Sequence, residues 1–209
     1  SSLLFQDRFA EAAAPLAEAL RLAPRRGAGH RLGYCLLALG DFQRAEAQLR
    51  REIEAWPDLI DAYNTLGVAL INQSRLEEAL PVFLEAARRD PRSVSAHNNI
   101  ANVLGDLGRN AEALPHLQKA VELDPALAES HHNLGMLLES LKRHEEAAAS
   151  LEQALRLAPN APYTLSHLVW NEISTCRWAG VEARIEALRS KVREGRSAAE
   201  PFIFVAVSA

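Results

Sequence analysis

Asparagine side chains recur in this sequence at a spacing that suggests one shared surface. Asn99 and Asn133 occupy the same phase of a pattern that repeats along the chain, and Asn64, Asn98 and Asn102 flank that phase. Because an asparagine amide offers both a donor and an acceptor, it can pair with the N–H and C=O of a peptide backbone. Asparagine is also a poor mid-helix residue, so its recurrence needs a reason. The pattern favours binding of an extended polypeptide; the alternative is that these side chains cap turns or bond between repeats.

Acidic side chains and one histidine share the predicted surface. They are Asp61, Asp106, Glu129, Glu139 and His132, and Arg31 is the main cation. A surface with so few cations does not suit a terminal carboxylate, which needs several Lys or Arg side chains. We expect a neutral or basic peptide, the alternative being that the acids are ordinary solvated helix surface. The predicted peptide-binding residues are Asn64, Asn98, Asn99, Asn102, Asn133, His132, Asp61 and Asp106.

Three nearby histidines could suggest a metal site. His131, His132 and His144 have no cysteine or supporting acid placed to complete a zinc site. His131 and His144 also stand at repeat positions that elsewhere hold Tyr63 and Phe42, so we expect both to have structural roles. The sequence therefore predicts no bound metal.

The two cysteines give no sign of catalysis. Cys35 and Cys176 lie far apart, which favours a reduced, cytoplasmic protein. Cys35 is expected to be a small buried hydrophobe, and Cys176 lacks a nucleophile motif. We predict no catalytic residue and no cofactor in this chain.

A repeat with a period of roughly 34 residues organises the chain. Prolines mark it at Pro24, Pro57, Pro91, Pro125 and Pro159. Between two of them, Tyr63, Leu66, Gly67 and Leu70 fall on one helix face, and after an interruption at residues 73–75 a second helical pattern runs to Pro91. Small residues such as Gly67 would let the two helices approach closely. Each unit is therefore expected to be a helix, a turn and a second helix, with Gly40 and Gly108 in turns that need a positive φ.

These repeated residues resemble the tetratricopeptide repeat (TPR) family. The resemblance implies an all-α fold, a right-handed TPR superhelix (an α-solenoid) of helix-turn-helix repeats with C-terminal packing helices. It also implies that the first helices of the repeats line a groove for proteins or extended peptides. We expect a half repeat over 1–25, four repeats over 26–161, packing helices over 162–195 and an extended segment over 196–209 that leads to a missing domain.

Two parts of the chain depart from the repeat pattern. In the repeat over 26–57, Glu52 stands where a small residue usually packs, and Gly27, Ala28 and Gly29 weaken the helix start. After Val169 the pattern is expected to fail, because no glycine turn follows. We expect Trp170 and Trp178 to lie in the core of the terminal helices.

The junction after the repeats resembles the O-linked N-acetylglucosamine transferase family, including its bacterial relatives. The resemblance rests on Cys176, Arg177 and Trp178, followed by a helix and Pro201-Phe202. Arg177 replaces the usual acid. The family's catalytic residues would lie beyond Ala209, so the chain alone is expected not to be an enzyme, although its parent protein could be a glycosyltransferase.

Composition excludes several classes of function. A net charge of −4 gives no electrostatic case for nucleic acid. No apolar run reaches the ~18 residues of a membrane span. We therefore expect a peptide-binding module, the substrate-recruiting arm of an O-linked glycosyltransferase-like protein. The alternatives are a free-standing TPR adaptor and a homo-oligomeric scaffold without catalysis.

Overall fold

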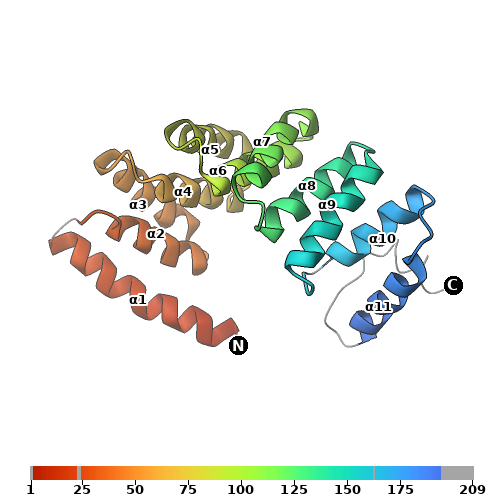
Figure 1. Cartoon of the computed structure of the whole chain (residues 1–209). Coiled ribbons are helices and arrows are strands. Elements are labelled where there is room, and N and C mark those ends of the chain that lie inside the picture. Colours follow the sequence, from red (N-terminus) through yellow and green to blue (C-terminus); the bar gives the residue numbers. More distant parts are fainter. Residues whose placement is uncertain (1, 23–24, 162, 194–209) are drawn as a thin grey trace. The chain divides into compact units, whose positions relative to one another are not determined.

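The computed structural model describes residues 2–22, 25–161 and 163–193, and all regular secondary structure in these ranges is α-helical (Figure 1). The all-α expectation is confirmed. The helices are α1 (Ser2–Leu22), α2 (Ala28–Ala38), α3 (Phe42–Ala55), α4 (Ile60–Asn72), α5 (Leu76–Arg89), α6 (Val94–Asp106), α7 (Asn110–Leu123), α8 (Ala128–Ser140), α9 (His144–Leu157), α10 (Thr164–Ser174) and α11 (Val181–Arg193). The extended segment expected over 196–209 lies outside the described residues.

The chain divides into two compact units, Ser1–Leu107 and Gly108–Ala209. Unit 1 contains α1 to α6 and unit 2 contains α7 to α11; the boundary falls in a turn inside the third full repeat of the sequence. Within unit 1 the first helices of the repeats, α2, α4 and α6, contact one another in series, and within unit 2 the first helices α8 and α10 do the same. Each unit therefore has a continuous first-helix surface of its own.

The turns between paired helices share one backbone conformation. Gly40 and Gly108 have φ of 79° and 73°, as expected, and Ser74 and Lys142 take the same left-handed conformation with φ of 60° and 62°. The residue after the turn donates its N–H to the carbonyl five residues earlier, which ends the first helix. These bonds are Asp41 to Leu36, Arg75 to Leu70 and Arg143 to Leu138.

Glycine on the first helix admits a large side chain from the second. A Cβ atom added to Gly67 would overlap the ring of Phe83, and one added to Gly135 would lie 2.6 Å from Leu151 Cγ. Phe83 and Leu151 are completely buried. The expectation that small residues permit close helix packing is confirmed, and the core of these two repeats lies at this contact.

In three of the repeats, a side chain near the start of the first helix fastens the repeat to the preceding one, and two of these contacts show the pattern. Tyr63 Oη donates to the carbonyl of Pro57 at 3.1 Å, and His131 Nε2 lies 3.0 Å from the carbonyl of Pro125. His131 is thus structural, as the sequence indicated, because it bonds the proline that ends the previous second helix.

Glu52 explains both irregular features of its repeat. Its side chain is buried, and Oε1 accepts the N–H of Gly27 at 2.6 Å, at the N-terminus of α2. A Cβ atom at Gly29 would collide with Oε2 of the same carboxylate. The missing small residue and the glycines at the helix start therefore compensate each other, since the carboxylate fills the space that the glycines leave.

We expect Glu52→Ala to lower the free energy of unfolding by about 1–3 kcal/mol, because the Gly27 N–H loses its acceptor and a void opens beside α2. A rule based on the usual small residue would predict stabilisation instead. Urea unfolding followed by circular dichroism decides between these signs. Adding Gly29→Ala to Glu52→Ala should recover part of the loss, whereas Gly29→Ala alone should destabilise.

The repeat conformation continues further than the sequence indicated. Cys176, one repeat after Lys142, has φ of 54°, and the N–H of Arg177 bonds the carbonyl of Glu172 at 2.9 Å. The expected failure of the turn is wrong, because a non-glycine residue adopts the left-handed conformation here. Glu172 consequently occupies the position of Leu36, Leu70 and Leu138, yet it is only 1% exposed.

The two C-terminal tryptophans are not core residues. Trp170 is 40% exposed and Trp178 is 63% exposed, which corrects the expectation of burial. Trp170 has the helical phase of Tyr34, another exposed aromatic on a first helix, and Trp178 lies in the irregular turn before α11. The helical phase of the repeat was the signal that would have placed Trp170 at the surface.

Candidate peptide-binding surface

One of the predicted asparagine positions joins neighbouring first helices instead of facing a ligand. In unit 1, Asn64 Nδ2 donates to Ser95 Oγ at 3.0 Å, so α4 is tied to α6. In unit 2, His132 occupies the same repeat position, and its Nδ1 lies 2.9 Å from Thr164 Oγ1 on α10. Asn98, again at this position, is only 4% exposed. For Asn64 and His132 the structure shows bonds between repeats, as the alternative interpretation had it.

The next residue along each helix behaves differently. Asn99 and Asn133 are half-buried, and neither makes a side-chain hydrogen bond within the described part of the chain. Asn133 Nδ2 is buried without an acceptor. A buried amide donor without a partner costs about 1–3 kcal/mol, so such a group calls for an explanation. Asn64 Oδ1 and Asn98 Oδ1 are also buried without a partner. Of these four side chains, however, only Asn99 and Asn133 are bonded through neither end of the amide, so these two are the asparagines best suited to a ligand.

The remaining predicted residues of unit 1 are accessible. Asp61 on α4 and Asn102 and Asp106 on α6 are exposed. Asn99, Asn102 and Asp106 follow the helical spacing that places side chains on one face of α6. Since α4 and α6 contact each other, the accessible members of the predicted site share the first-helix surface of unit 1.

A buried polar network underlies the corresponding surface of unit 2. Glu139 Oε2 on α8 accepts from Asn171 Nδ2 at 2.7 Å and lies 3.2 Å from His167 Nδ1, both on α10. Asn171 Oδ1 in turn lies 2.8 Å from His144 Nδ1. Because the Asn171 oxygen can only accept, His144 carries its proton on Nδ1. His144 therefore has the structural role that the sequence indicated.

Two groups in this region have shifted acidities. Burial alone would raise the pKa of Glu139, but hydrogen bonds from His167 and Asn171 and the charge of His167 hold that pKa below its ordinary value. Burial, and then the charge of His167, lower the pKa of His132. At neutral pH the network therefore contains an ionised Glu139 and a neutral His132.

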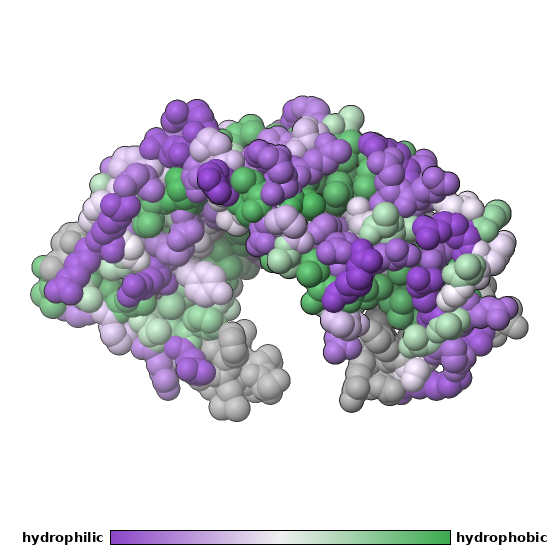
Figure 2. Space-filling model, in the orientation of Figure 1, coloured by the Kyte–Doolittle hydropathy of each residue, from purple (hydrophilic) through white to green (hydrophobic). Residues whose placement is uncertain are grey.

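Neither a metal centre nor a membrane-spanning helix is found in the described ranges. Across residues 2–22, 25–161 and 163–193, no group of three or more His, Cys, Asp or Glu side chains could hold a metal ion. In those same ranges no helix is both long and apolar enough to cross a bilayer. On the face seen in Figure 2, hydrophilic residues cover much of the surface and hydrophobic residues show mainly between them.

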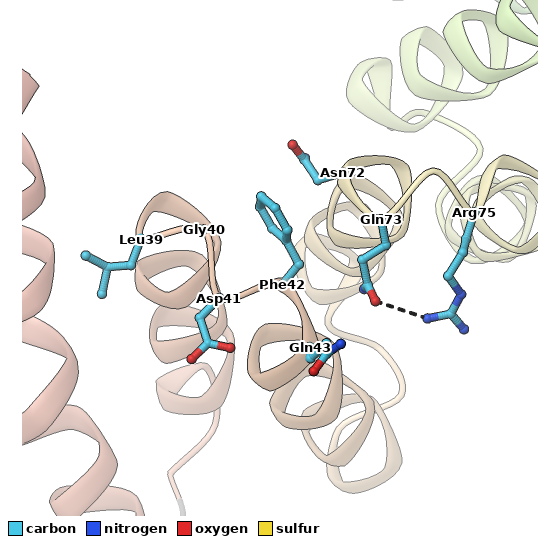
Figure 3. Close-up of a pocket in the computed structure, with 8 residues that line it drawn as sticks. All are labelled: Leu39, Gly40, Asp41, Phe42, Gln43, Asn72, Gln73 and Arg75. Atoms are coloured by element: carbon cyan, nitrogen blue, oxygen red, sulfur yellow. Dashed lines mark hydrogen bonds between the residues drawn. The ribbon is translucent and has the colours of Figure 1, made fainter.

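A pocket in unit 1 lies at the turns, and none of the predicted peptide-binding residues lines it. It is lined by Leu39, Gly40, Asp41, Phe42, Gln43, Asn72, Gln73 and Arg75 (Figure 3). Its main polar groups are engaged within the protein: Arg75 Nη1 and Gln73 Nε2 both bond Glu46 Oε2, at 2.6 and 3.0 Å. These bonds to Glu46 join two neighbouring repeats. The pocket therefore offers a ligand few polar groups that lack a partner.

Solved structures with the same fold are numerous. MamA from Desulfovibrio magneticus has a TM-score of 0.71 at 20% identity, covering 81% of this chain and 98% of the other. YrrB, described as a TPR protein with an unusual peptide-binding site, has a TM-score of 0.67 at 19% identity, and the match covers 83% of this chain and 90% of YrrB. A thermophilic TPR protein from Thermus thermophilus has a TM-score of 0.65 at 25% identity, and the match covers 83% of this chain and 94% of the other. No curated protein matches the chain.

Family models for the tetratricopeptide repeat match residues 1–60, 30–94 and 92–160. The matched residues include the left-handed turns at Gly40, Ser74, Gly108 and Lys142, the close glycine contacts and the histidine or tyrosine anchors described above. The chain belongs to the tetratricopeptide repeat family.

Proposed function

We propose that this TPR protein-interaction module binds extended peptides along the first-helix surface of each unit, through Asn99 in unit 1 and Asn133 in unit 2. The observation that carries the proposal is that both amides are without side-chain hydrogen bonds within the described residues. Amide groups that alternate donor and acceptor suit a peptide backbone and depend little on the ligand's side chains. Asp61, Asn102 and Asp106 border the surface of unit 1.

We expect the double variant Asn99→Ala, Asn133→Ala to weaken binding of peptides selected from a random library by about tenfold, because on either surface the peptide loses one amide that can both donate and accept a hydrogen bond. Its melting temperature should not fall, since neither side chain bonds another part of the protein and Asn133→Ala removes a buried donor that has no acceptor. Calorimetric titration and thermal unfolding measure the two effects.

Asn64→Ala is the matched control, because Asn64 bonds Ser95 across the repeat boundary. It should lower the melting temperature. A large loss of stability in the double variant, with affinity unchanged, would show that Asn99 and Asn133 are structural and would contradict the proposal.

We further propose that the module is the substrate-recruiting arm of a bacterial, cytoplasmic O-linked glycosyltransferase-like protein. The support is the Cys176-Arg177-Trp178 element with Pro201-Phe202 after the following helix. The alternatives are a free-standing adaptor and a self-associating scaffold. The reading frame after Ala209 tests the proposal: an α/β glycosyltransferase sequence supports it, and a stop codon at or near Ala209 contradicts it.

A further inference from the structure

Glu139 uses only one of its two carboxylate oxygens within the protein. Oε2 accepts from Asn171 and lies beside His167 Nδ1, whereas Oε1 has no hydrogen-bond partner within the described residues. The side chain retains 21% of its exposure. Because Asn171 and His167 hold the carboxylate in place, Oε1 can accept from an outside donor without a large loss of side-chain entropy.

Trp170 comes from the turn of α10 against which Glu139 packs. It follows His167 by three residues and precedes Asn171, and its side chain is 40% exposed. Residues three apart on a helix are neighbours on its surface, so Trp170 borders His167, the residue that contacts Glu139. The face of an indole ring attracts cations more strongly than any other side-chain ring.

No lysine or arginine of the same two helices competes for this place, and His167 contacts Glu139 through Oε2 and not Oε1. The sequences of α8 and α10 contain Glu129, Glu139 and Glu172 but no lysine or arginine, whereas the second helices α7 and α9 carry Lys119 and Arg156. Glu172 is paired with Arg184, but Glu129 and Glu139 have no lysine or arginine partner among the described residues. The first-helix surface of unit 2 is therefore electrostatically complementary to a positive ligand.

We propose that Glu139 and Trp170 form a subsite for one lysine or arginine side chain of the bound peptide. The aliphatic stem of that side chain lies against the indole, and its ammonium or guanidinium group donates to Glu139 Oε1. Asn133, on the same helix as Glu139, can then engage the peptide backbone. The inference rests on the proposed peptide-binding function and specifies which peptides unit 2 prefers.

The first test is the composition of peptides that the whole chain selects from a random library. Enrichment of one lysine or arginine position is expected. If no peptide is selected, the proposed function itself fails. If peptides are selected and bind, but replacing their basic residue by norleucine or glutamine leaves affinity unchanged, the peptide-binding function stands and the subsite is overturned.

The second test removes the ring. Trp170→Ala should weaken binding of a lysine-containing peptide about three- to tenfold and should have little effect on its glutamine variant. Trp178→Ala is the matched control, because Trp178 is an exposed tryptophan outside the first-helix surface, and it should change neither affinity. Equal losses for the lysine and glutamine peptides would contradict a cation subsite.

The third test pairs Glu139→Gln with the lysine-to-glutamine change in the peptide. The two changes together should cost less than the sum of their separate costs, since each removes the same ion pair. Because Glu139→Gln also alters the bonds to His167 and Asn171, Trp170→Leu supplies a variant that keeps apolar cover and the buried network. Two results together would overturn the proposal. In one, the affinity losses from Glu139→Gln and from the lysine-to-glutamine change in the peptide are additive; in the other, Trp170→Leu still prefers the lysine peptide over the glutamine peptide as strongly as the parent does.

Discussion

Phe83→Ala is expected to lower the free energy of unfolding by about 3–5 kcal/mol, the loss typical of removing a buried phenylalanine. Phe83 is completely buried, and its ring fills the space that Gly67 leaves on the facing helix α4. The adjacent helices cannot close the void easily, because their separation is also set by the neighbouring repeats. In a repeat protein each unit is stabilised by its neighbours, so the loss should reach beyond this helix pair. Chemical unfolding followed by the helical circular dichroism signal measures it.

Leu84→Ala is the control on the same helix, because Leu84 is among the exposed hydrophobic residues. Surface substitutions of this kind change stability by about 0.5 kcal/mol or less. Phe83→Leu should also be milder than Phe83→Ala, since leucine stands at the equivalent position in other repeats, as Leu49 and Leu151. Similar losses for Phe83→Ala and Leu84→Ala would contradict the packing described here.

The repeat architecture could be predicted because its determinants are local and periodic. The spacing of Pro57 and Pro91, the glycine in the turn at Gly40 and the small residue at Gly67 each act within one or two helices. A family resemblance based on several tandem units adds these small signals together. The helical fold and the tight packing followed from them.

The candidate site was predicted less well because a shift of one residue along a helix decides whether a side chain faces the neighbouring repeat or the surface. Asn98 and Asn99 are adjacent, yet one is buried and the other is half-exposed, since successive helical residues point about 100° apart. Sequence alone placed both in the groove. The structure assigns the Asn64 and His132 bonds to the contact between repeats and leaves Asn99 and Asn133 as the candidate ligand contacts.

The C-terminal part was missed for a different reason. Glu172 stands one repeat after Leu138, so an acid at a leucine position was visible in the sequence. Its compensating charge comes from the next helix, α11, through a contact that no repeat pattern specifies: Arg184 Nη1 lies 2.9 Å from Glu172 Oε1. Only the packed structure shows why the acid is tolerated there.

Arg184→Met is therefore expected to destabilise unit 2 by about 3 kcal/mol at neutral pH, the cost of leaving one partner of a buried ion pair uncompensated. Glu172 is 1% exposed, and its Oε2 atom is buried without a hydrogen bond, so Arg184 is its direct charge partner. Arg184 also lies 3.5 Å from Glu152, which ties α11 to α9 as well as to α10. Removing the guanidinium should loosen α11 first, which hydrogen exchange of residues 181–193 would detect.

The loss should depend on pH with a definite sign. Burial raises the pKa of Glu172, while the charges of Arg184 and Arg177 oppose that rise. A carboxyl whose pKa is higher in the folded state than in the unfolded state costs stability when it ionises, so its cost grows as the pH rises through that interval. Without Arg184 the pKa of Glu172 rises further. The difference between Arg184→Met and the parent should therefore shrink as the pH falls toward about 4, the ordinary glutamate range.

Glu172→Leu distinguishes this account from simple loss of packing by Arg184. The substitution restores the residue type of Leu36, Leu70 and Leu138, and an apolar replacement of a buried ion pair is often neutral or stabilising. Combined with Arg184→Met, it should recover most of the lost stability and remove the pH-dependent part of the difference. If the double variant is as unstable as Arg184→Met alone at every pH, then the Arg184 stem, and not its charge on Glu172, holds α11 in place.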